Sequence, residues 1–317
     1  MDAMKGFLRM HARALYDLLR QAQNNALSKR HSAMAEADVS AELARMYKRR
    51  IGREPDFESP RRYTEKIQWR KLHGLTPEMA RLSDKYAVRK WVADRIGDEY
   101  LVSLFGRWAQ AADIDFDALP QEFVLKTNNG SSTNIIVRDR SKLDVADACK
   151  RLDEWMAYQM GWVYFERQYN DIVPCIIAEE MLHPAAGEND LRDYKFLCFD
   201  GEPLFVWVDI DRYTNHTRAM FDTNWNLQNW NQYNYPPSPY VPERPACLDE
   251  MLRLARKLSA GFDHVRVDLY EVDGKVYFGE MTFTNGSGFE RIVPDEYDEV
   301  LGGYWTLPKP VEKKALE

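Results

Sequence analysis

Three charged side chains near the C-terminal end, Arg266, Asp268 and Glu280, have the types and spacing for phosphate or metal chemistry. They lie in the stretch VRVDLYEVDGKVYFGEMTFTNGSG, which is expected to form a strand, a tight turn at its Asp-Gly dipeptide, a second strand and a small-residue loop. A three-residue loop would pair Arg266 with Glu280 and Asp268 with Phe278. A two-residue loop would instead place Asp268 and Glu280 on opposite faces.

The three-residue loop is preferred because only that register separates apolar from charged side chains. The apolar face would hold Val265, Val267, Leu269, Tyr277 and Met281. The other face would bring two carboxylates together, and these repel each other unless a cation lies between them. Because oxygen ligands suit Mg²⁺, a magnesium site is one interpretation. A solvated strand face with one Arg–Asp pair is the other.

A second candidate site follows the strand-like run that ends at Lys126. The next loop, Thr127 to Thr133, contains only small polar residues, so its backbone N–H groups could surround phosphate oxygens. Lys126 would add a point charge. An ordinary polar hairpin loop is the competing interpretation, and the loop is not a Walker A sequence. Lys195, a lone cation in an apolar strand, requires either a carboxylate or a ligand phosphate as its partner.

Helices are expected at 83–97 and 142–168. In the first, Ser83 is a good N-cap and Gly97 suits the C-terminal end. Lys85 and Arg89 are four residues apart and therefore share a helix face. This pair indicates either a nearby anion or an ordinary exposed helix.

The segment from Arg212 to Ala246 is polar, aromatic and proline-bearing, and is expected to be a long surface excursion. Arg212, His216 and Arg218 are candidates for binding an acidic sugar or a carboxylate, because a guanidinium can bind anions in a bidentate manner. His216 alone is more typical of a structural histidine.

The bulk properties restrict the partners and the compartment. The chain has 317 residues and a net charge of −7, so there is no global electrostatic case for nucleic acid. Its four cysteines have no metal-like spacing, and a reducing cytoplasm is the expected location. No apolar run approaches the roughly 20 residues needed to span a bilayer. Residues 1–31 have an amphipathic, basic pattern that suits the inner membrane surface, a partner or the protein's own core.

Taken in order, these features resemble the ATP-grasp superfamily. The order is Asp84-Lys85, then Lys126 with its loop, a strand ending in Glu179-Glu180, Arg266-x-Asp268 and finally Glu280. More specifically, DKYAVRKWV, FVLKTNNGSS, IIAEEML, DYKFLCFDGEP, VRVDLY and YFGEMTF resemble the TupA-like ATP-grasp family, over roughly 57–308. That family is named for teichuronopeptide synthesis and is associated with bacterial surface-polysaccharide gene clusters.

The resemblance implies an α+β fold in which antiparallel sheets of two subdomains enclose ATP, with an extra N-terminal helical segment. The implied divisions are the helical segment at 1–56, an ATP-grasp domain at 57–308 and a tail at 309–317. Within the domain, 57–120 is an N-terminal part, 121–182 the lid subdomain and 183–308 the catalytic subdomain.

The resemblance also implies individual roles. Arg266, Lys126 and Lys195 would be catalytic, with Arg266 stabilising the transferring charge. The residues implied to bind ATP are Lys85, Lys126, Asn128, Gly130, Ser131, Ser132, Glu179, Glu180, Met181, Leu182 and Lys195.

The implied metal ligands are Asp268 and Glu280. The superfamily pattern is Glu-x-Asn, but Thr282 stands here in place of the asparagine, so Thr282 and Asn285 are weaker candidates for the remaining ligand. The substrate candidates are Arg89, Arg212, His216 and Arg218.

The implied reaction joins a carboxylate to an amine through an acyl phosphate, giving an amide, ADP and phosphate. The expected cofactors are ATP and Mg²⁺. The expected substrates are small or glycan-linked carboxylates and amines, such as a sugar acid or an amino acid in capsule or surface-polysaccharide synthesis. The alternatives are a kinase, a glycan-modifying transferase, or a non-catalytic ATP-binding scaffold; retention of Lys126, Asp268 and Glu280 together argues against the scaffold.

Overall fold

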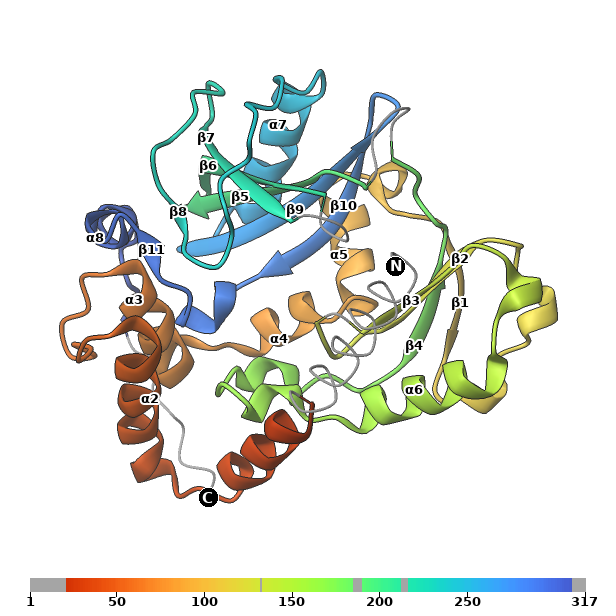
Figure 1. Ribbon diagram of the computed structural model, residues 1–317, viewed down its shortest axis with the longest axis horizontal. Coiled ribbons are helices and arrows are strands. Elements are labelled where there is room, and N and C mark those ends of the chain that lie inside the picture. Colours follow the sequence, from red (N-terminus) through yellow and green to blue (C-terminus); the bar gives the residue numbers. More distant parts are fainter. Residues whose placement is uncertain (1–20, 132, 185–189, 212–215, 310–317) are drawn as a thin grey trace, which may run out of the picture.

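The computed structural model describes residues 21–131, 133–184, 190–211 and 216–309, and Figure 1 shows two antiparallel sheets flanked by helices. The large, 5-stranded sheet has the order β10-β9-β5-β6-β7. Its strands are β5 (Asp193–Phe199), β6 (Glu202–Ile210), β7 (Thr217–Asp222), β9 (His264–Val272) and β10 (Lys275–Thr282). The smaller, 4-stranded sheet has the order β1-β4-β2-β3. Its strands are β1 (Leu104–Trp108), β2 (Phe123–Thr127), β3 (Asn134–Val137) and β4 (Ile176–Glu179). A short ribbon pairs β8 (Asn231–Gln232) with β11 (Ile292–Val293).

The helices pack on these sheets through their apolar faces. They are α2 (Glu36–Ile51), α3 (Tyr63–Trp69), α4 (Pro77–Ser83), α5 (Ala87–Ile96), α6 (Val145–Ala157), α7 (Leu248–Ser259) and α8 (Glu296–Gly303). Helices α4, α5 and α7 bury one face of the large sheet, and α6 packs on the small sheet through Ala148 and Leu152. The fold is therefore two helix-covered sheets, which is the layered arrangement that the resemblance implied.

The other face of the large sheet is divided into two halves. Near α3 and α8 it is apolar: Leu197, Phe199, Phe205 and Trp207 pack there against residues that include Ile67 and Trp305. Farther along the same strands the same face carries charge. We call this second half the charged floor, and its members are Asp193, Lys195, Asp209, Arg266, Asp268 and Glu280. Because side chains alternate along a strand, β5 and β6 each contribute to both halves from one face.

The described part of the N-terminal segment packs on the rest of the chain. Residues 21–32 are helical, and the fully buried His31 ring stacks on Phe165 with ring centroids 4.5 Å apart. Helix α2 forms a cluster with Phe165 and Phe289. Residues 1–20 lie outside the described part, so the membrane interpretation of that stretch stays a prediction. Within the described ranges, no helix has both the length and the apolar character to cross a membrane.

Helix α6 ends earlier than predicted. It stops at Ala157 and has 13 residues, and short 3-10 turns follow up to Tyr169, so the expected helix over 142–168 is about twice as long as the observed one. The chain reverses close to Gly161, where an added Cβ would lie 2.8 Å from the Glu166 carbonyl oxygen. The reversal carries residues 163–169 back towards the large sheet.

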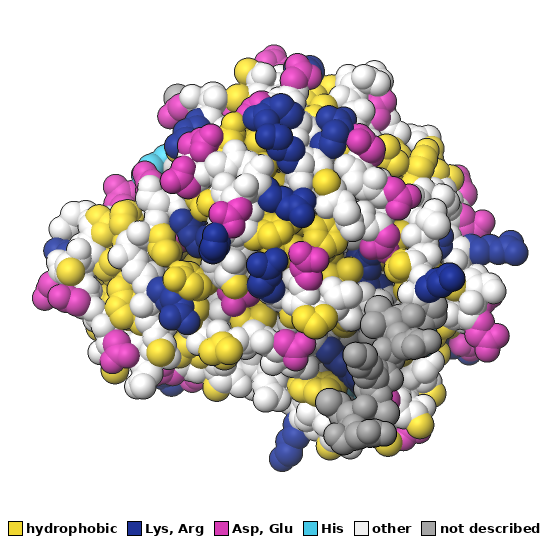
Figure 2. All heavy atoms as spheres, turned by 180° about the vertical axis from the view of Figure 1, so that it is seen from behind, with side chains coloured by type: hydrophobic (Ala, Val, Ile, Leu, Met, Phe, Trp, Pro, Cys, Tyr) yellow, Lys and Arg dark blue, Asp and Glu magenta, His cyan; other side chains and the backbone are white. Residues whose placement is uncertain are grey.

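The rear face of the molecule has a mixed surface. Figure 2 shows basic and acidic side chains interspersed over much of this face, around scattered apolar groups. Such a distribution has no single-sign field of the kind that guides a polyanion.

Candidate active site

Lys195 forms the centre of the charged floor. Its Nζ atom lies 2.7 Å from Asp268 Oδ2 and 3.9 Å from Asp209 Oδ2, and it also contacts Asp193. The residue is only 5 % exposed. Burial alone would lower the pKa of Lys195, but Asp193 and Asp268 outweigh it and raise the pKa. Lys195 therefore has the carboxylate partners that the sequence required, and it stays a cation.

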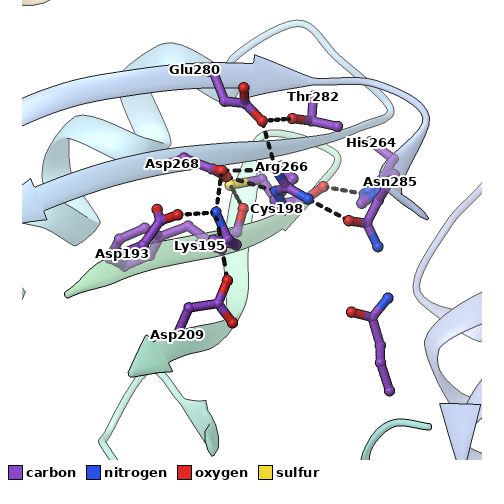
Figure 3. Close-up of polar contacts among 12 residues, drawn as sticks. Asp193, Lys195, Cys198, Asp209, His264, Arg266, Asp268, Glu280, Thr282 and Asn285 are labelled. Carbon is purple, nitrogen blue, oxygen red and sulfur yellow. Dashed lines mark hydrogen bonds and ion pairs between the residues drawn. The ribbon is translucent and has the colours of Figure 1, made fainter. Parts of the chain in front are cut away.

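Arg266 links the two carboxylates that the sequence singled out. Its Nε and Nη2 atoms each lie 2.7 Å from one oxygen of Asp268, and Nη2 is also 2.8 Å from Glu280 Oε1 (Figure 3). Its Nη1 atom donates to Asn285. One guanidinium thus holds Asp268, Glu280 and Asn285 in fixed relative positions.

The predicted hairpin register is wrong, although the predicted charged face is right. Val272 pairs with Lys275 across a two-residue turn, in which Asp273 and Gly274 both have positive φ, as a type I′ turn requires. The register then shifts at Gly279, so that Glu280 pairs with Asp268 instead of with Arg266. A β-bulge of this kind adds one residue and redirects the side chains beyond it.

Gly279 is required at this bulge. A Cβ atom there would lie 2.9 Å from the Asp268 carbonyl oxygen and 3.1 Å from the Tyr270 ring. Between the turn and the bulge, the side chains of β10 therefore point to the faces opposite to those predicted. Val276 and Phe278 are in the core beside α7, and Tyr277 is not. Tyr277 was therefore assigned to the wrong face, while Val265, Val267, Leu269 and Met281 were assigned correctly.

Glu280 is the accessible carboxylate of the floor. Its side chain is 44 % exposed, whereas that of Asp268 is 2 % exposed. Burial raises its pKa, but Arg266, Lys195 and Lys85 outweigh this effect and lower the pKa of Glu280 to about 2. Both of its hydrogen bonds, from Arg266 and from Thr282 Oγ1 at 2.7 Å, fall on Oε1. The group is thus ionised, with its Oε2 atom outside both bonds.

A second charged group lies on and beside the small sheet. We call it the hinge cluster; its members are Lys85, Arg89, Lys126 and Glu179. Lys126 Nζ and Arg89 Nη1 each lie 2.7 Å from a different oxygen of Glu179. Lys85 donates to the carbonyl of Gly130 in the β2–β3 loop, and its burial lowers its pKa.

Lys85 connects the two groups. The charges that act on it come from Glu280 of the floor and from Lys126 and Glu179 of the hinge cluster. Glu280 in turn responds to Lys85. Lys85, which bonds to the β2–β3 loop, is therefore close enough to Glu280 of the floor for their charges to interact.

The structure shows the local contacts of the remaining predicted nucleotide residues. The Asn128 side chain holds the loop from inside, with its Oδ1 atom accepting from Cys175 N at 2.7 Å. Ser131 N contacts the Met160 sulfur at 3.4 Å. Glu180 bonds to Ser103 through both its backbone and its side chain. Met181 is buried and Leu182 half-buried directly after β4. Ser132 lies outside the described residues.

The predicted surface excursion is wrong at Arg218. This residue lies in β7 and is 4 % exposed, with Nε 2.5 Å and Nη2 2.9 Å from the two oxygens of Asp209. Its Nη1 atom donates to Gln232. His216 Nε2 lies 3.1 Å from Asp209 Oδ1. Arg218 is therefore fully occupied by its own chain, and Arg212 lies outside the described residues.

The comparison with protein families decides the relationship. The model described as TupA-like ATPgrasp matches residues 65–306, which is most of the chain. This chain belongs to the TupA-like ATP-grasp family. Membership of an ATP-grasp family supports ATP-dependent ligase activity in broad terms.

Solved structures resemble this TupA-like chain at low identity. A D-alanine–D-alanine ligase from Bacillus anthracis complexed with ATP is 17 % identical, with a TM-score of 0.36, over 64 % of this chain and 55 % of that one. The ATP-grasp ligase PsnB complexed with a minimal precursor, Mg and ADP is 12 % identical, with a TM-score of 0.36, over 72 % and 60 %. A D-alanyl-alanine synthetase A from Vibrio cholerae is 10 % identical, with a TM-score of 0.38, over 69 % and 62 %. The chain thus spans less than two thirds of the length of these structures. A comparison with curated proteins found no match.

The family motifs did not reveal every residue at this site. Asp193 and Asp209 complete the floor: Asp193 lies two residues from Lys195 on β5, and Asp209 pairs with Asp193 across β5–β6 and with Arg218 across β6–β7. Tyr169 and Glu290 also lie near it. Burial raises the pKa of both, and Arg266 acts on both groups. No local sequence pattern indicates that either residue belongs to the site, because each reaches the floor from a distant segment.

Proposed function

We propose that this chain is an ATP-dependent carboxylate–amine ligase that works on the charged floor. The observation that carries the proposal is Lys85, which bonds to the β2–β3 loop and interacts electrostatically with Glu280 of the floor and with Lys126 and Glu179 of the hinge cluster. The cations of the two groups would then face one triphosphate. We further propose the small sheet with 121–182 as the lid and 183–308 as the catalytic subdomain.

In the proposed first step, a substrate carboxylate oxygen attacks the γ-phosphorus of ATP. The bond to the β,γ-bridging oxygen breaks, ADP leaves, and an acyl phosphate forms. Phosphoryl transfer depends mainly on positioning and on neutralising the equatorial oxygens. Lys126 and Lys85 would hold the nucleotide phosphates, while Arg266 and Lys195 would face the transferring group across the floor.

In the second step, the amine nitrogen attacks the acyl carbon and phosphate leaves. The nitrogen loses a proton, so the products are an amide, ADP and phosphate. None of these steps requires a nucleophilic side chain. Lys126 forms an ion pair with Glu179. This pair would separate when ATP binds, so that Lys126 could contact the phosphates.

The donor set fits Mg²⁺. Glu280 is ionised and accessible and would hold the ion through Oε2, while Asp268 and Asn285 would join it by exchanging their bonds to Arg266. Within the described ranges, no three His, Cys, Asp or Glu side chains form a metal cluster. Mg²⁺ is commonly held by one or two carboxylates together with substrate phosphates. When bound, the ion would supply charge neutralisation at the β- and γ-phosphates. Thr282 is not needed as a ligand, because it donates to Glu280.

The substrates follow from the resemblance. We propose a small or glycan-linked carboxylate and an amine, such as a sugar acid or an amino acid used in bacterial capsule or surface-polysaccharide synthesis, handled in the cytoplasm or at the inner membrane face. Arg89 is paired with Glu179 beside the nucleotide, so it is a poorer candidate for the acceptor than His216 at the far edge of the floor.

The first test is nucleotide binding, measured by thermal unfolding with Mg-ATP, with Mg-ADP and without nucleotide. A ligand at one hundred times its Kd stabilises the fold by about 2.7 kcal/mol. We expect this shift in the wild type, its loss in Lys126→Ala, and its retention in Lys142→Ala, which removes an exposed lysine paired with Asp139. No shift in the wild type at millimolar nucleotide would contradict the proposal.

The ligase chemistry is then tested with hydroxylamine as the amine and with pools of uronic and amino acids. Hydroxylamine converts an acyl phosphate to a hydroxamate, with release of ADP and phosphate. ADP without free phosphate would point instead to a kinase.

A further inference from the structure

The loop that follows β10 has an unusual backbone. It comprises Thr284–Phe289 and contains the short helical turn η8 (Asn285–Gly288). Gly286, Ser287 and Gly288 have φ values of 54°, 53° and 65°, so three consecutive residues are left-handed. Glycine accepts this conformation readily, but a serine rarely does. Ser287 must therefore be held in place by its surroundings.

The inner side of the loop reaches the charged floor. Asn285 is 3 % exposed, and its Oδ1 atom accepts from Arg266 Nη1. The guanidinium that contacts Asp268 and Glu280 is thereby also fixed by the loop. Any shift of the loop backbone would move the amide that orients Arg266.

The outer side of the loop is held by buried polar side chains from two distant segments. We call them the support network: Gln68, Lys71, Glu166 and Gln168, all under 8 % exposed. Glu166 accepts from Thr284 Oγ1 at 2.5 Å and from Ser287 Oγ at 2.7 Å. Its two oxygens thus bracket the strained part of the loop.

The other members bond to the backbone and to Thr284. Lys71 Nζ donates to the Ser287 carbonyl at 2.8 Å and to the Tyr164 carbonyl at 2.8 Å. Gln68 Nε2 donates to the carbonyls of Ser287 and Gly288 at 3.0 and 2.8 Å. Gln168 Nε2 donates to Thr284 Oγ1 at 2.9 Å. Ser287 is therefore bonded through both its side chain and its carbonyl.

We infer that Glu166 is a positioning residue for the proposed phosphoryl transfer: it holds Ser287 left-handed, and through Asn285 it orients Arg266. The inference rests on the proposed function and adds to it a residue outside the family motifs. It also assigns a role to the 163–169 segment, which lies between α6 and β4 and bonds to the loop that follows β10 from outside both sheets.

The test compares two nucleotides in Glu166→Ala. An ATP analogue with a β,γ-imido bridge presents a γ-phosphate to Arg266, and ADP does not. We expect the Kd of the Mg-bound analogue to rise about tenfold, the value of one hydrogen bond to a charged group, while the Kd of Mg-ADP changes less than about twofold. Arg266→Lys should show the same selective loss.

A second substitution separates positioning from general stability. Adding Ser287→Gly to Glu166→Ala restores none of the lost hydrogen bonds, but it makes the left-handed backbone accessible. We expect it to recover a large part of the affinity for the analogue. Equal weakening of both nucleotides, or a lower Tm with unchanged affinities and no recovery, would overturn the inference. Glu166→Gln keeps the shape of the side chain and one hydrogen-bond acceptor. It replaces the alanine variant in these measurements if that variant does not fold.

A crystal structure of Glu166→Ala or Glu166→Gln gives a readout that needs no nucleotide. Loss of the Asn285–Arg266 hydrogen bond in the alanine variant is expected, and its retention would overturn the inference. If the wild type binds neither nucleotide, the proposed ligase function fails, and this structural measurement still decides whether Glu166 positions the loop.

Discussion

The two halves of one sheet face bury opposite kinds of side chain, apolar in one half and charged in the other, on the same strands. Lys195 and Leu197 lie two residues apart on β5 and point to the same side. Leu197 is fully buried among apolar groups, whereas Lys195 is buried among carboxylates. Burying an apolar side chain is favourable in itself, but burying a charge is costly unless it is paired. The apolar half can therefore anchor the sheet, while the charged half persists only as a compensated set.

The largest expected effect comes from removing the central cation of that set. Lys195→Met leaves Asp193, Asp209 and Asp268 facing each other without it. Breaking a buried pair in this way costs about 3–5 kcal/mol, and we expect the nucleotide-induced stabilisation to disappear as well. Urea unfolding with and without Mg-ADP measures both quantities.

Leu197→Ala is the matched control on the same strand. Truncating a buried leucine costs about 2–5 kcal/mol, so the unfolding free energy should fall by a similar amount. The Kd for Mg-ADP, measured well below the unfolding transition, should nevertheless stay within about twofold. Equal damage to binding in the two variants would show that the halves are not separable.

A smaller effect on stability is expected at the exposed end of the floor. Glu280→Gln removes the charge that pairs with Arg266 from a half-exposed side chain, and solvent-exposed ion pairs contribute about 0–1 kcal/mol to the free energy of unfolding. Binding of Mg-ATP should weaken strongly, because the ionised carboxylate is lost. A Tm change as large as that of Lys195→Met would place Glu280 with the structural charges, and calorimetry with Mg-ATP reports the binding.

The smallest effect concerns Lys71, a buried lysine outside the floor. Burial lowers the pKa of Lys71 to about 7, in contrast to Lys195, whose carboxylates raise it. Between about pH 7 and its ordinary value, the unfolded chain binds a proton that the folded chain has lost. Stability should therefore rise with pH across this range. Tm measured from pH 7 to 9 should show a rise of a few degrees that is smaller in Lys71→Met and unchanged in Lys142→Met. An identical pH slope in wild type and Lys71→Met would contradict the assignment.

Several members of the charged floor could be predicted from the sequence, but their geometry could not. Alternation along the strands correctly placed Arg266, Asp268 and Glu280 together, and the requirement of a buried lysine for a partner correctly predicted that Lys195 would have one. The hairpin register failed because apolar alternation was assumed to be unbroken. The bulge is caused by Gly279, and an isolated glycine inside a strand pattern is the signal that could have indicated it.

Other features depend on contacts between segments far apart in the chain. Arg218 lies in a short strand that its polar and proline-bearing surroundings concealed. Tyr169 and Glu166 reach the loop and the floor only because the chain reverses after α6. No local propensity encodes such a contact, since it depends on how two separately formed units meet.

The pairing of Glu179 with both Lys126 and Arg89 also bears on ionic strength. When an anion binds exposed lysines, dissolved salt screens the attraction, and its affinity falls steeply as salt is added. Here Lys126 and Arg89 are already neutralised by a carboxylate of the same chain, and they are partly shielded from solvent. Nucleotide would exchange one anion for another at these positions. Its affinity should therefore depend on salt less steeply than the number of cations around the phosphates would suggest.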